Sequence, residues 1–455
     1  MAMSVESRTP FSARDRTSWV TVFVTFINFS AFHAVREGYA ASKSVMASSM
    51  KYPTVLLGVI DAAFCIAYAI GLFFSGLIGK KYGVKKVIMV SFASTASLSL
   101  AFGVLNGYVF TTPTTSTQAW ETALVSHLPI WVLSGFVQSL AYPNFIALLS
   151  DVIEPSFCGI VISIWAIVSP VGDIIGLEAA KKVLQSGDEN WPYIMFLAAA
   201  FMMFNFFLFV IFVVPVRVNI DNSEEEGVQQ ALLGNENDVE SSATRRSPTL
   251  KELMWNVWNI PGVIDFALSV MCLKVVVTSV LFWLPYYMDK RFDSHGSSIL
   301  STQVFDVSLI VGMILTAAVH RAMGQNRWVP IFMTSLFIGI IPIALVPLAT
   351  TLHWTVVCIF FSGALIGPSS ALFASVMGAE IGKRAQTFGT GNIVGVISGF
   401  IDSSGAVGSG LGQLLVGFVA SSAGWTLVFE MLAAFTALGA LCLIRVRKLE
   451  NERNH

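Results

Sequence analysis

Long apolar runs are the feature that most constrains what this chain can fold into. A helix that crosses a membrane needs about 20 mostly apolar residues, because the hydrocarbon core is about 30 Å thick. The runs here lack the strict apolar–polar alternation of a membrane β-barrel. We therefore predict an all-α membrane protein with twelve transmembrane helices. The predicted spans are residues 19–44, 55–79, 86–107, 127–150, 157–183, 191–216, 259–288, 300–322, 328–350, 353–378, 387–420 and 425–446.

The composition supports a lipid environment. Charged residues make up 12% of the chain and the mean hydropathy is +0.72, whereas soluble domains carry about 25% charged residues. A net charge of −1 without a basic patch excludes a nucleic-acid binder. The five cysteines lie in apolar runs without metal-ligand spacing, so no disulfide framework, metal site or cofactor is expected. Membrane lipid is the expected surroundings, and a monomer is the expected state.

The lysines and arginines predict the orientation of the chain. If both termini are cytoplasmic, 19 of the 27 basic residues fall on the cytoplasmic side, as the positive-inside rule requires. Lys43 and Lys51 are counted with the six residues of the opposite side. Arg36 and Lys274 remain inside the membrane. The chain is thus predicted to be a multi-pass protein, and its sequence does not distinguish the plasma membrane from the endoplasmic reticulum or another organelle membrane.

A polar segment divides the chain into two parts. Residues 221–240 contain seven acidic residues and no basic one, a composition typical of disordered linkers. The predicted organisation is an N-terminal tail (1–18), a first six-helix half (19–217), a cytoplasmic linker (218–255), a second six-helix half (256–446) and a C-terminal tail (447–455).

The two parts contain faint internal matches. Asp61 in the second span has a counterpart in Asp306 in the eighth, and the Val-Gly pair at 171–172 recurs at 407–408. Parallel six-helix halves joined by a linker are the layout of major facilitator transporters, whose substrate site lies between the halves near the bilayer midplane. The repeat therefore predicts two pseudo-symmetric halves that work by alternating access.

Arg36 and Lys274 are the candidate anion contacts. A charged group at the centre of a bilayer costs at least about 2.5 kcal/mol and needs a partner or a function. The two residues lie at comparable depths in the first and seventh spans, which would line the cavity between pseudo-symmetric halves. Arginine suits phosphate through its planar fork, and lysine adds a point charge. The alternative is that each is neutralised and only stabilises the bundle.

Two neighbours of Arg36 qualify this hypothesis. Glu37 would lower the positive charge of the site if it also faces the cavity. His33 lies four residues before Glu37, so the two side chains share a helix face and could form a hydrogen bond. The alternative for His33 is a role in carrying protons.

Other charged residues are predicted to have gating or structural roles. Asp61 and Asp306 are expected to lock contacts between helices rather than to carry protons. Asp402 lies in a glycine-rich span, where close helix packing could expose it to the cavity. Lys80 and Lys81 follow the second span and are expected to fix topology and attract lipid, with clamping of the inward gate as the alternative.

Together these segments resemble the sugar-phosphate exchanger family, within the organophosphate:phosphate antiporters of the major facilitator superfamily. The resemblance rests on HAVREGYAASKSVM, DAAFCIAYAIGLFFSGLIGKKYG, LKVVVTSVLFWLPYYM, GPSSALFASVMGAEIG and GFIDSSGAVGSGLGQ. It implies a twelve-helix transporter that exchanges a sugar phosphate or glycerol phosphate for inorganic phosphate. By this resemblance Arg36 and Lys274 contact the anion, and Tyr39 is counted with the substrate contacts. Asp61, Asp306, Asp402 and Gln413 also fall on positions that the family fills similarly.

The chain departs from the family at several positions. Glu37 stands where members commonly have lysine, and Lys80 stands where an acid is usual. Ser169 and Leu72 replace a histidine and a lysine of bacterial relatives, and His320 occupies the loop counterpart of Lys80. These differences leave the fold unaffected but bear on which anion is carried.

We therefore expect a secondary active antiporter that exchanges an organic phosphate for inorganic phosphate. The main alternative is a proton-coupled carrier of another small organic anion or polar metabolite, with Glu37, Asp61 or Asp402 as the proton site. A receptor or scaffold that transports nothing would not need charged residues in a cavity. An enzyme is disfavoured because no nucleophile–base or metal-ligand cluster occurs.

Overall fold

The computed structural model describes residues 13–109, 115–153, 167–213, 258–292, 295–323, 328–372 and 394–453, together with Pro113, Val161, Ile164 and Trp165. The predicted linker at 218–255 lies outside these residues, as does most of the predicted N-terminal tail. The last predicted residues, 447–455, continue a helix as far as Arg453.

Helices make up nearly all of the described chain, because a backbone in lipid must satisfy its own hydrogen bonds. In the first half they are α1 (Ala13–Ser49), α2 (Thr54–Tyr82), α3 (Val84–Val104), α4 (Ser116–Thr122), α5 (Leu128–Ser139), α6 (Ala141–Val152), α8 (Val168–Leu184) and α9 (Pro192–Phe212). Short π-helical and 3₁₀ segments adjoin them at η1 (Leu105–Val109), η2 (Ala123–His127) and η3 (Asp188–Asn190).

The second half repeats this pattern with longer single helices. They are α12 (Val263–Phe292), α13 (His295–Met323), α14 (Trp328–Leu345), α15 (Leu352–Leu372), α17 (Val394–Ser422) and α18 (Trp425–Arg453), with a 3₁₀ turn, η4 (Val346–Leu348), after α14.

The predicted set of twelve spans is confirmed. Eleven helical segments in the described part are long and apolar enough to cross a membrane, and α8, with 17 residues, is the further helix. The fourth span is longer than predicted: it runs from Ser116 to Leu149 through α4, η2, α5 and α6. The first is also longer, because α1 begins at Ala13 and ends at Ser49.

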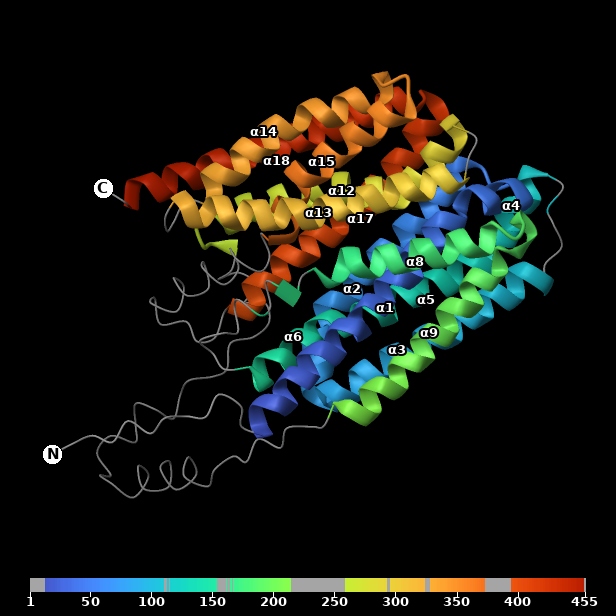
Figure 1. Ribbon diagram of the computed structural model, residues 1–455, viewed down its shortest axis with the longest axis horizontal. Helices are drawn as coiled ribbons and strands as arrows, with labels where there is room; N and C mark the ends of the chain where they lie inside the picture. The colour runs from blue at the N-terminus through green and yellow to red at the C-terminus, as the bar shows by residue number, and fades with distance from the viewer. Residues whose placement is uncertain are drawn as a thin grey trace.

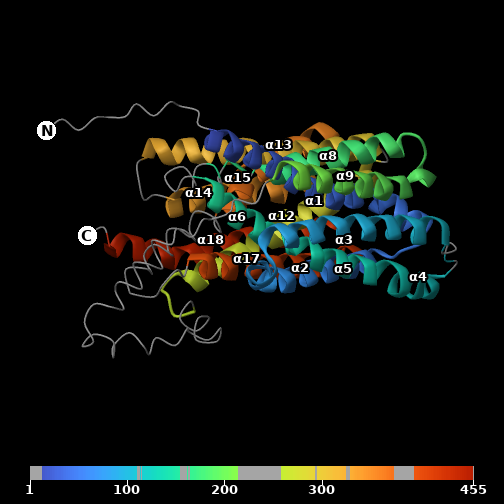
Figure 2. The same cartoon turned by 90° about the horizontal axis from the view of Figure 1, so that it is seen from below.

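The two halves lie side by side along their length (Figure 1). The first half runs from blue to green and the second from yellow to red, and Figure 2 shows the same helices from below. The start of α1 and the end of α18 lie at the same end of the molecule, here called the terminal end. The opposite end, here called the far end, holds the turns that follow α1 and α12.

The outer surface is apolar and the polar groups lie inside. On α9, Phe204 and Ile211 are 57% and 64% exposed, whereas Asn205 between them is fully buried. Asn205 accepts a 2.9 Å hydrogen bond from Asn28 Nδ2 on α1. This distribution is expected of helices in lipid, where a polar side chain needs a partner inside the bundle.

Glycines on equivalent helices confirm the repeat. A Cβ at Gly176 of α8 would lie 2.2 Å from the carbonyl oxygen of Ala34 on α1, and a Cβ at Gly408 of α17 would lie 2.2 Å from that of Met271 on α12. Only glycine permits this approach. The α1–α8 crossing of the first half thus recurs as the α12–α17 crossing of the second.

Candidate anion site

A central cavity of about 250 Å³ lies between the two halves. It is lined from the first half by α1, α2, α6 and α8, and from the second by α12, α13, α15 and α17. The charged residues of its lining are Arg36, Glu37, Asp173, Lys274 and Asp402. A shared cavity with charges from both halves is what the repeat predicted.

Arg36 is held by a polar and an aromatic contact. Its Nε donates a 2.8 Å hydrogen bond to Gln138 Oε1 on α5, and Gln138 Nε2 in turn donates to Ser134 Oγ at 2.8 Å. Its guanidinium carbon lies 4.7 Å from the centre of the Tyr68 ring. The buried Nη2 has no hydrogen-bond partner within the described protein. The contacts therefore fix the orientation of the fork and leave donors for a ligand.

Lys274 approaches the same cavity from α12. Asp402 on α17, in the same half, also lines the cavity and interacts with Lys274 electrostatically. Across the cavity Lys274 also interacts electrostatically with Arg36 and Asp173. The two predicted cations thus share one space, although Lys274 is partly offset by an acid and Arg36 is held by a neutral amide.

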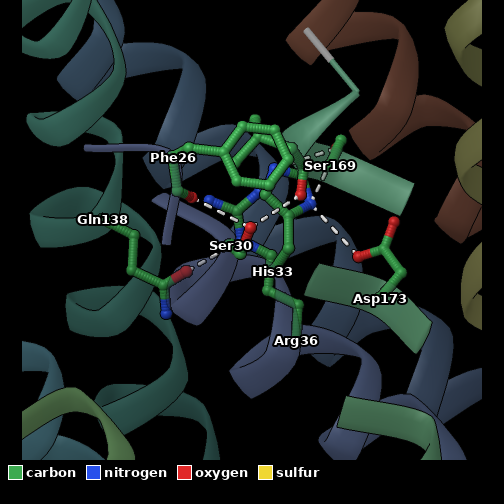
Figure 3. Close-up of polar contacts among 8 residues, drawn as sticks. Phe26, Ser30, His33, Arg36, Gln138, Ser169 and Asp173 are labelled. Carbon is green, nitrogen blue, oxygen red and sulfur yellow. Dashed lines mark hydrogen bonds and ion pairs between the residues drawn. The ribbon is translucent and has the colours of Figure 1, made fainter. Parts of the chain in front are cut away.

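His33 is bound to a different acid from the one predicted. Its Nδ1 donates to Asp173 Oδ1 on α8 at 3.1 Å, and Ser169 Oγ lies 2.9 Å from the same nitrogen. Figure 3 shows His33 and Arg36 reaching from α1 to opposite sides, toward Asp173 and Gln138. The predicted His33–Glu37 pairing is therefore wrong, because an acid on the neighbouring helix lies in better position than the one four residues along α1.

Glu37 faces the cavity but is almost fully enclosed. It is 1% exposed, it is one of the lining residues, and its Oε2 has no hydrogen-bond partner within the described protein. It therefore places a carboxyl group in the lining of the site, as the sequence suggested.

The formal charge of the cavity differs from the one inferred from sequence. Arg36, Glu37 and Lys274 alone would give +1, but Asp173 and Asp402 also line the space. With all five ionised and His33 neutral, the lining carries −1. Binding of an anion here is favoured if the acids are protonated or engaged locally: His33 donates a hydrogen bond to Asp173, and Lys274 offsets Asp402.

Tyr39 lies away from the cavity. Its hydroxyl is 2.9 Å from His127 Nε2, and its ring stacks on Trp131 at 3.9 Å between centroids. It is 1% exposed and belongs to the interior of the first half. This placement does not support its predicted contact with substrate, because its hydroxyl and ring are engaged within the first half and Tyr39 is not one of the residues that line the cavity.

Lys43 is the charged residue that sequence reasoning misplaced. The sequence predicts it on the non-cytoplasmic side, but it is fully buried and forms an ion pair with the equally buried Asp61. The error comes from the predicted end of the first span at residue 44, since α1 continues to Ser49. The pairing agrees with the expectation that Asp61 locks a contact between helices.

The structure shows few contacts for the other residues with predicted gating or structural roles. Asp306 is fully buried on α13, and neither carboxylate oxygen has a hydrogen-bond partner within the described protein, so no lock is visible there. Lys81 is exposed near the Tyr82 ring at 5.1 Å, and the side chain of Lys80 is outside the described part. Gln138, which holds Arg36, gave no signal in the sequence because a glutamine in a span carries no charge.

Comparison with known proteins identifies the family. The family model of the Major Facilitator Superfamily matches residues 18–401. The chain belongs to the major facilitator superfamily. Among solved structures, the xylose transporter XylE from E. coli superposes with a TM-score of 0.66 at 14% identity, covering 93% of this chain and 98% of the other. This similarity shows that the chain has the same fold as XylE.

Curated relatives narrow the group within the superfamily. The chain is 24% identical to "Sugar phosphate exchanger 3" of Bos taurus over 93% of its length and 91% of the relative. It is 26% identical to "Putative glycerol-3-phosphate transporter 5" of Arabidopsis thaliana over 95% and 91%. These matches confirm the resemblance to the sugar-phosphate exchanger family. The relatives are named as transporters, so this member of the superfamily is a transporter rather than an enzyme.

Proposed function

We propose that the protein is a secondary active transporter that exchanges a small organic phosphate, such as a sugar phosphate or glycerol 3-phosphate, for inorganic phosphate. The observation that carries this proposal is the placement of Arg36 and Lys274, one from each half, on a single cavity. The printed names of the relatives support a phosphorylated substrate.

The state of Arg36 supports binding of phosphate rather than a purely structural role. Buried donors in proteins are almost always hydrogen-bonded, yet Arg36 Nη2 has no partner among the described residues. Gln138 occupies only Nε. A phosphate oxygen would supply the missing acceptor, and Lys274 would approach the same anion from the other half. His33, Glu37 and Asp402 surround this position and tune its charge.

Alternating access fits this arrangement. An anion held by both halves draws them together, so its binding can be coupled to rocking of one half against the other. The distribution of basic residues supports a cytoplasmic position for the terminal end, with both chain termini. We propose a monomer as the transporting unit, since one chain supplies both sides of the cavity.

Counterflow in proteoliposomes tests the exchange. Vesicles containing purified protein are loaded with phosphate, and uptake of labelled glycerol 3-phosphate or glucose 6-phosphate is followed. Internal phosphate should raise the initial uptake rate several-fold over empty vesicles, whereas labelled glycerol and glucose should not enter. Uptake that is independent of internal phosphate would contradict the exchange.

The charge of the cavity supports a second candidate, a proton-coupled carrier of another organic anion or polar metabolite. Three acidic and two basic side chains line the cavity, so a bound anion would be favoured if a proton bound with it. In vesicles prepared in the same way but without internal phosphate, an imposed pH gradient should then drive uptake. Exchange predicts that this gradient alone produces no accumulation.

A further inference from the structure

Lys43 connects the two halves at a point beyond the anion site. Its ammonium forms an ion pair with Asp61 of α2, in its own half. The same nitrogen donates a 2.8 Å hydrogen bond to the carbonyl oxygen of Phe282 on α12, in the other half. It also lies 4.5 Å from the centre of the Trp283 ring. One buried cation therefore binds both halves at once.

The surrounding contacts show that the halves are closed together at this end. Gly58 of α2 and Gly417 of α17 cross so closely that a Cβ at Gly58 would lie 2.9 Å from the Cα of Gly417. Gln303 Nε2 of α13 donates to Glu178 Oε2 of α8 at 3.2 Å. These residues lie toward the far-end termini of their helices. The far end is thus the packed end of the interface.

Lys43 lies between this packed end and the cavity. It follows Arg36 by seven residues, which places it on nearly the same face of α1 and about 10.5 Å closer to the far end. Phe282 and Cys65 are among the lining residues of the cavity. On α2, which begins at the far end, Cys65 lies one helical turn farther from that end than Asp61 does. A path from the far end to Arg36 between α1 and α12 would therefore pass the contact of Lys43 with Phe282.

We propose that Lys43, Asp61 and Phe282 form the far-end gate of this transporter, and that Lys43 is the residue that holds it shut. Opening the far end separates α1 and α2 from α12, so the hydrogen bond to Phe282 breaks while the ion pair with Asp61 moves with the first half. Because the acceptor in the second half is a backbone carbonyl, the contact can break without leaving an unpaired charge behind. This inference requires a transporter of alternating access but not a particular substrate.

Labelling of Cys65 tests the gate. The other cysteines (Cys158, Cys272, Cys358 and Cys442) are replaced by alanine, and a membrane-impermeant maleimide is added to oriented vesicles from the far side. The closed gate should protect Cys65. Lys43→Met should raise its far-side labelling rate on the order of tenfold, because a charged hydrogen bond between the halves is lost, and should lower labelling from the terminal side.

Two further variants separate gating from folding. Lys43→Met combined with Asp61→Asn leaves no unpaired buried charge, and it should show the same rise in labelling with a Tm close to that of the parent. Lys290→Ala removes an exposed positive charge near the same end of α12 and should leave labelling unchanged. Far-side labelling equal to the parent in the double variant would overturn the proposal.

The result is independent of the proposed substrate. Loss of phosphate-dependent counterflow with normal gating would reject the proposed function alone, and normal counterflow with unchanged Cys65 labelling would reject the gate alone. The labelling rate also distinguishes this role from a structural one, since a stabilising ion pair would change the Tm without changing the side from which Cys65 reacts.

Discussion

The two halves share their backbone packing but differ in their buried charges. Asp61 on α2 and Asp306 on α13 are repeat-related and both fully buried. Asp61 is paired with Lys43, whereas no hydrogen bond to either oxygen of Asp306 is seen in the described chain. Applying the spacing between Arg36 and Lys274 to Lys43 leads to Leu281, beside Phe282.

This difference shows what each half contributes. The second half has no lysine at the equivalent position, and its Phe282 carbonyl accepts a hydrogen bond from the lysine of the first half. If each half had its own buried ion pair, both pairs would lie within a half and neither would link the two. Lys43 instead pairs with Asp61 in its own half and donates to the Phe282 carbonyl of the other half. This difference in buried charge therefore adds a contact between the halves.

The largest expected effect is a loss of stability when Asp61, the acid paired with Lys43, is replaced. Asp61→Asn leaves the Lys43 ammonium buried without a counter-charge, and breaking a buried pair in this way costs about 3–5 kcal/mol of unfolding free energy. Asp306→Asn breaks no ion pair within the part of the chain that the structure describes and should change stability by less than about 1 kcal/mol. Thermal unfolding in detergent, followed by tryptophan fluorescence, compares the two matched substitutions.

The comparison fails if both variants lose stability equally. That outcome would mean that Asp306 has a charged partner in the folded protein. Adding Lys43→Met to Asp61→Asn should recover most of the loss, because the uncompensated ammonium is then gone.

The next largest effect should distinguish the two cavity cations. Among the described residues of the first half that line the cavity, Arg36 is the one arginine or lysine. Arg36→Ala removes its charge, and a charged hydrogen bond is worth about 1.5–3 kcal/mol. Affinity for an organic phosphate should fall roughly 10- to 150-fold, with normal insertion in the membrane. Competition by unlabelled phosphate esters in the counterflow assay measures this change.

Lys274→Ala provides the matched experiment in the second half. It leaves Asp402 facing the anion, so affinity should fall, but Lys274→Ala combined with Asp402→Asn should recover part of it. Equal losses in the single and double variants would show that Lys274 binds the anion independently of Asp402. Full activity of Arg36→Ala would reject the anion site as a whole.

The fold was predictable because lipid imposes simple rules. The twelve spans follow from run length and hydropathy, and Arg36 and Lys274 stand out because a charge within an apolar run requires an explanation. Their common cavity then follows from the repeat. These inferences depend on one segment, or on two equivalent ones, and require no knowledge of side-chain packing.

The contacts between helices could not be obtained in this way. His33 donates its hydrogen bond to Asp173 on α8. This partner could not be predicted, because residue spacing along one helix says nothing about an acid on the neighbouring helix. Lys43 lies close to the predicted end of its span, where hydropathy does not separate a buried lysine from an exposed one. The Tyr39 hydroxyl contacts His127 and does not face the cavity. Only the packing of α1 against its neighbours determines which of its side chains reach the cavity.

The smallest expected effect concerns the charge of the second half. Asp402→Asn removes one of three carboxylates from the lining, so the cavity should favour a doubly charged phosphate ester more strongly, by a few-fold in affinity, as expected for one charge in a solvated site. Because the second ionisation of a phosphate ester has a pKa of about 6, the gain should be larger at pH 7.5 than at pH 5.5. A matched change in the first half, Glu37→Gln, should act in the same direction, since Glu37 also lines the cavity. If neither substitution alters the dependence of affinity on pH, the acids are already neutral when the anion binds, and proton-coupled transport becomes the better explanation for the three carboxylates.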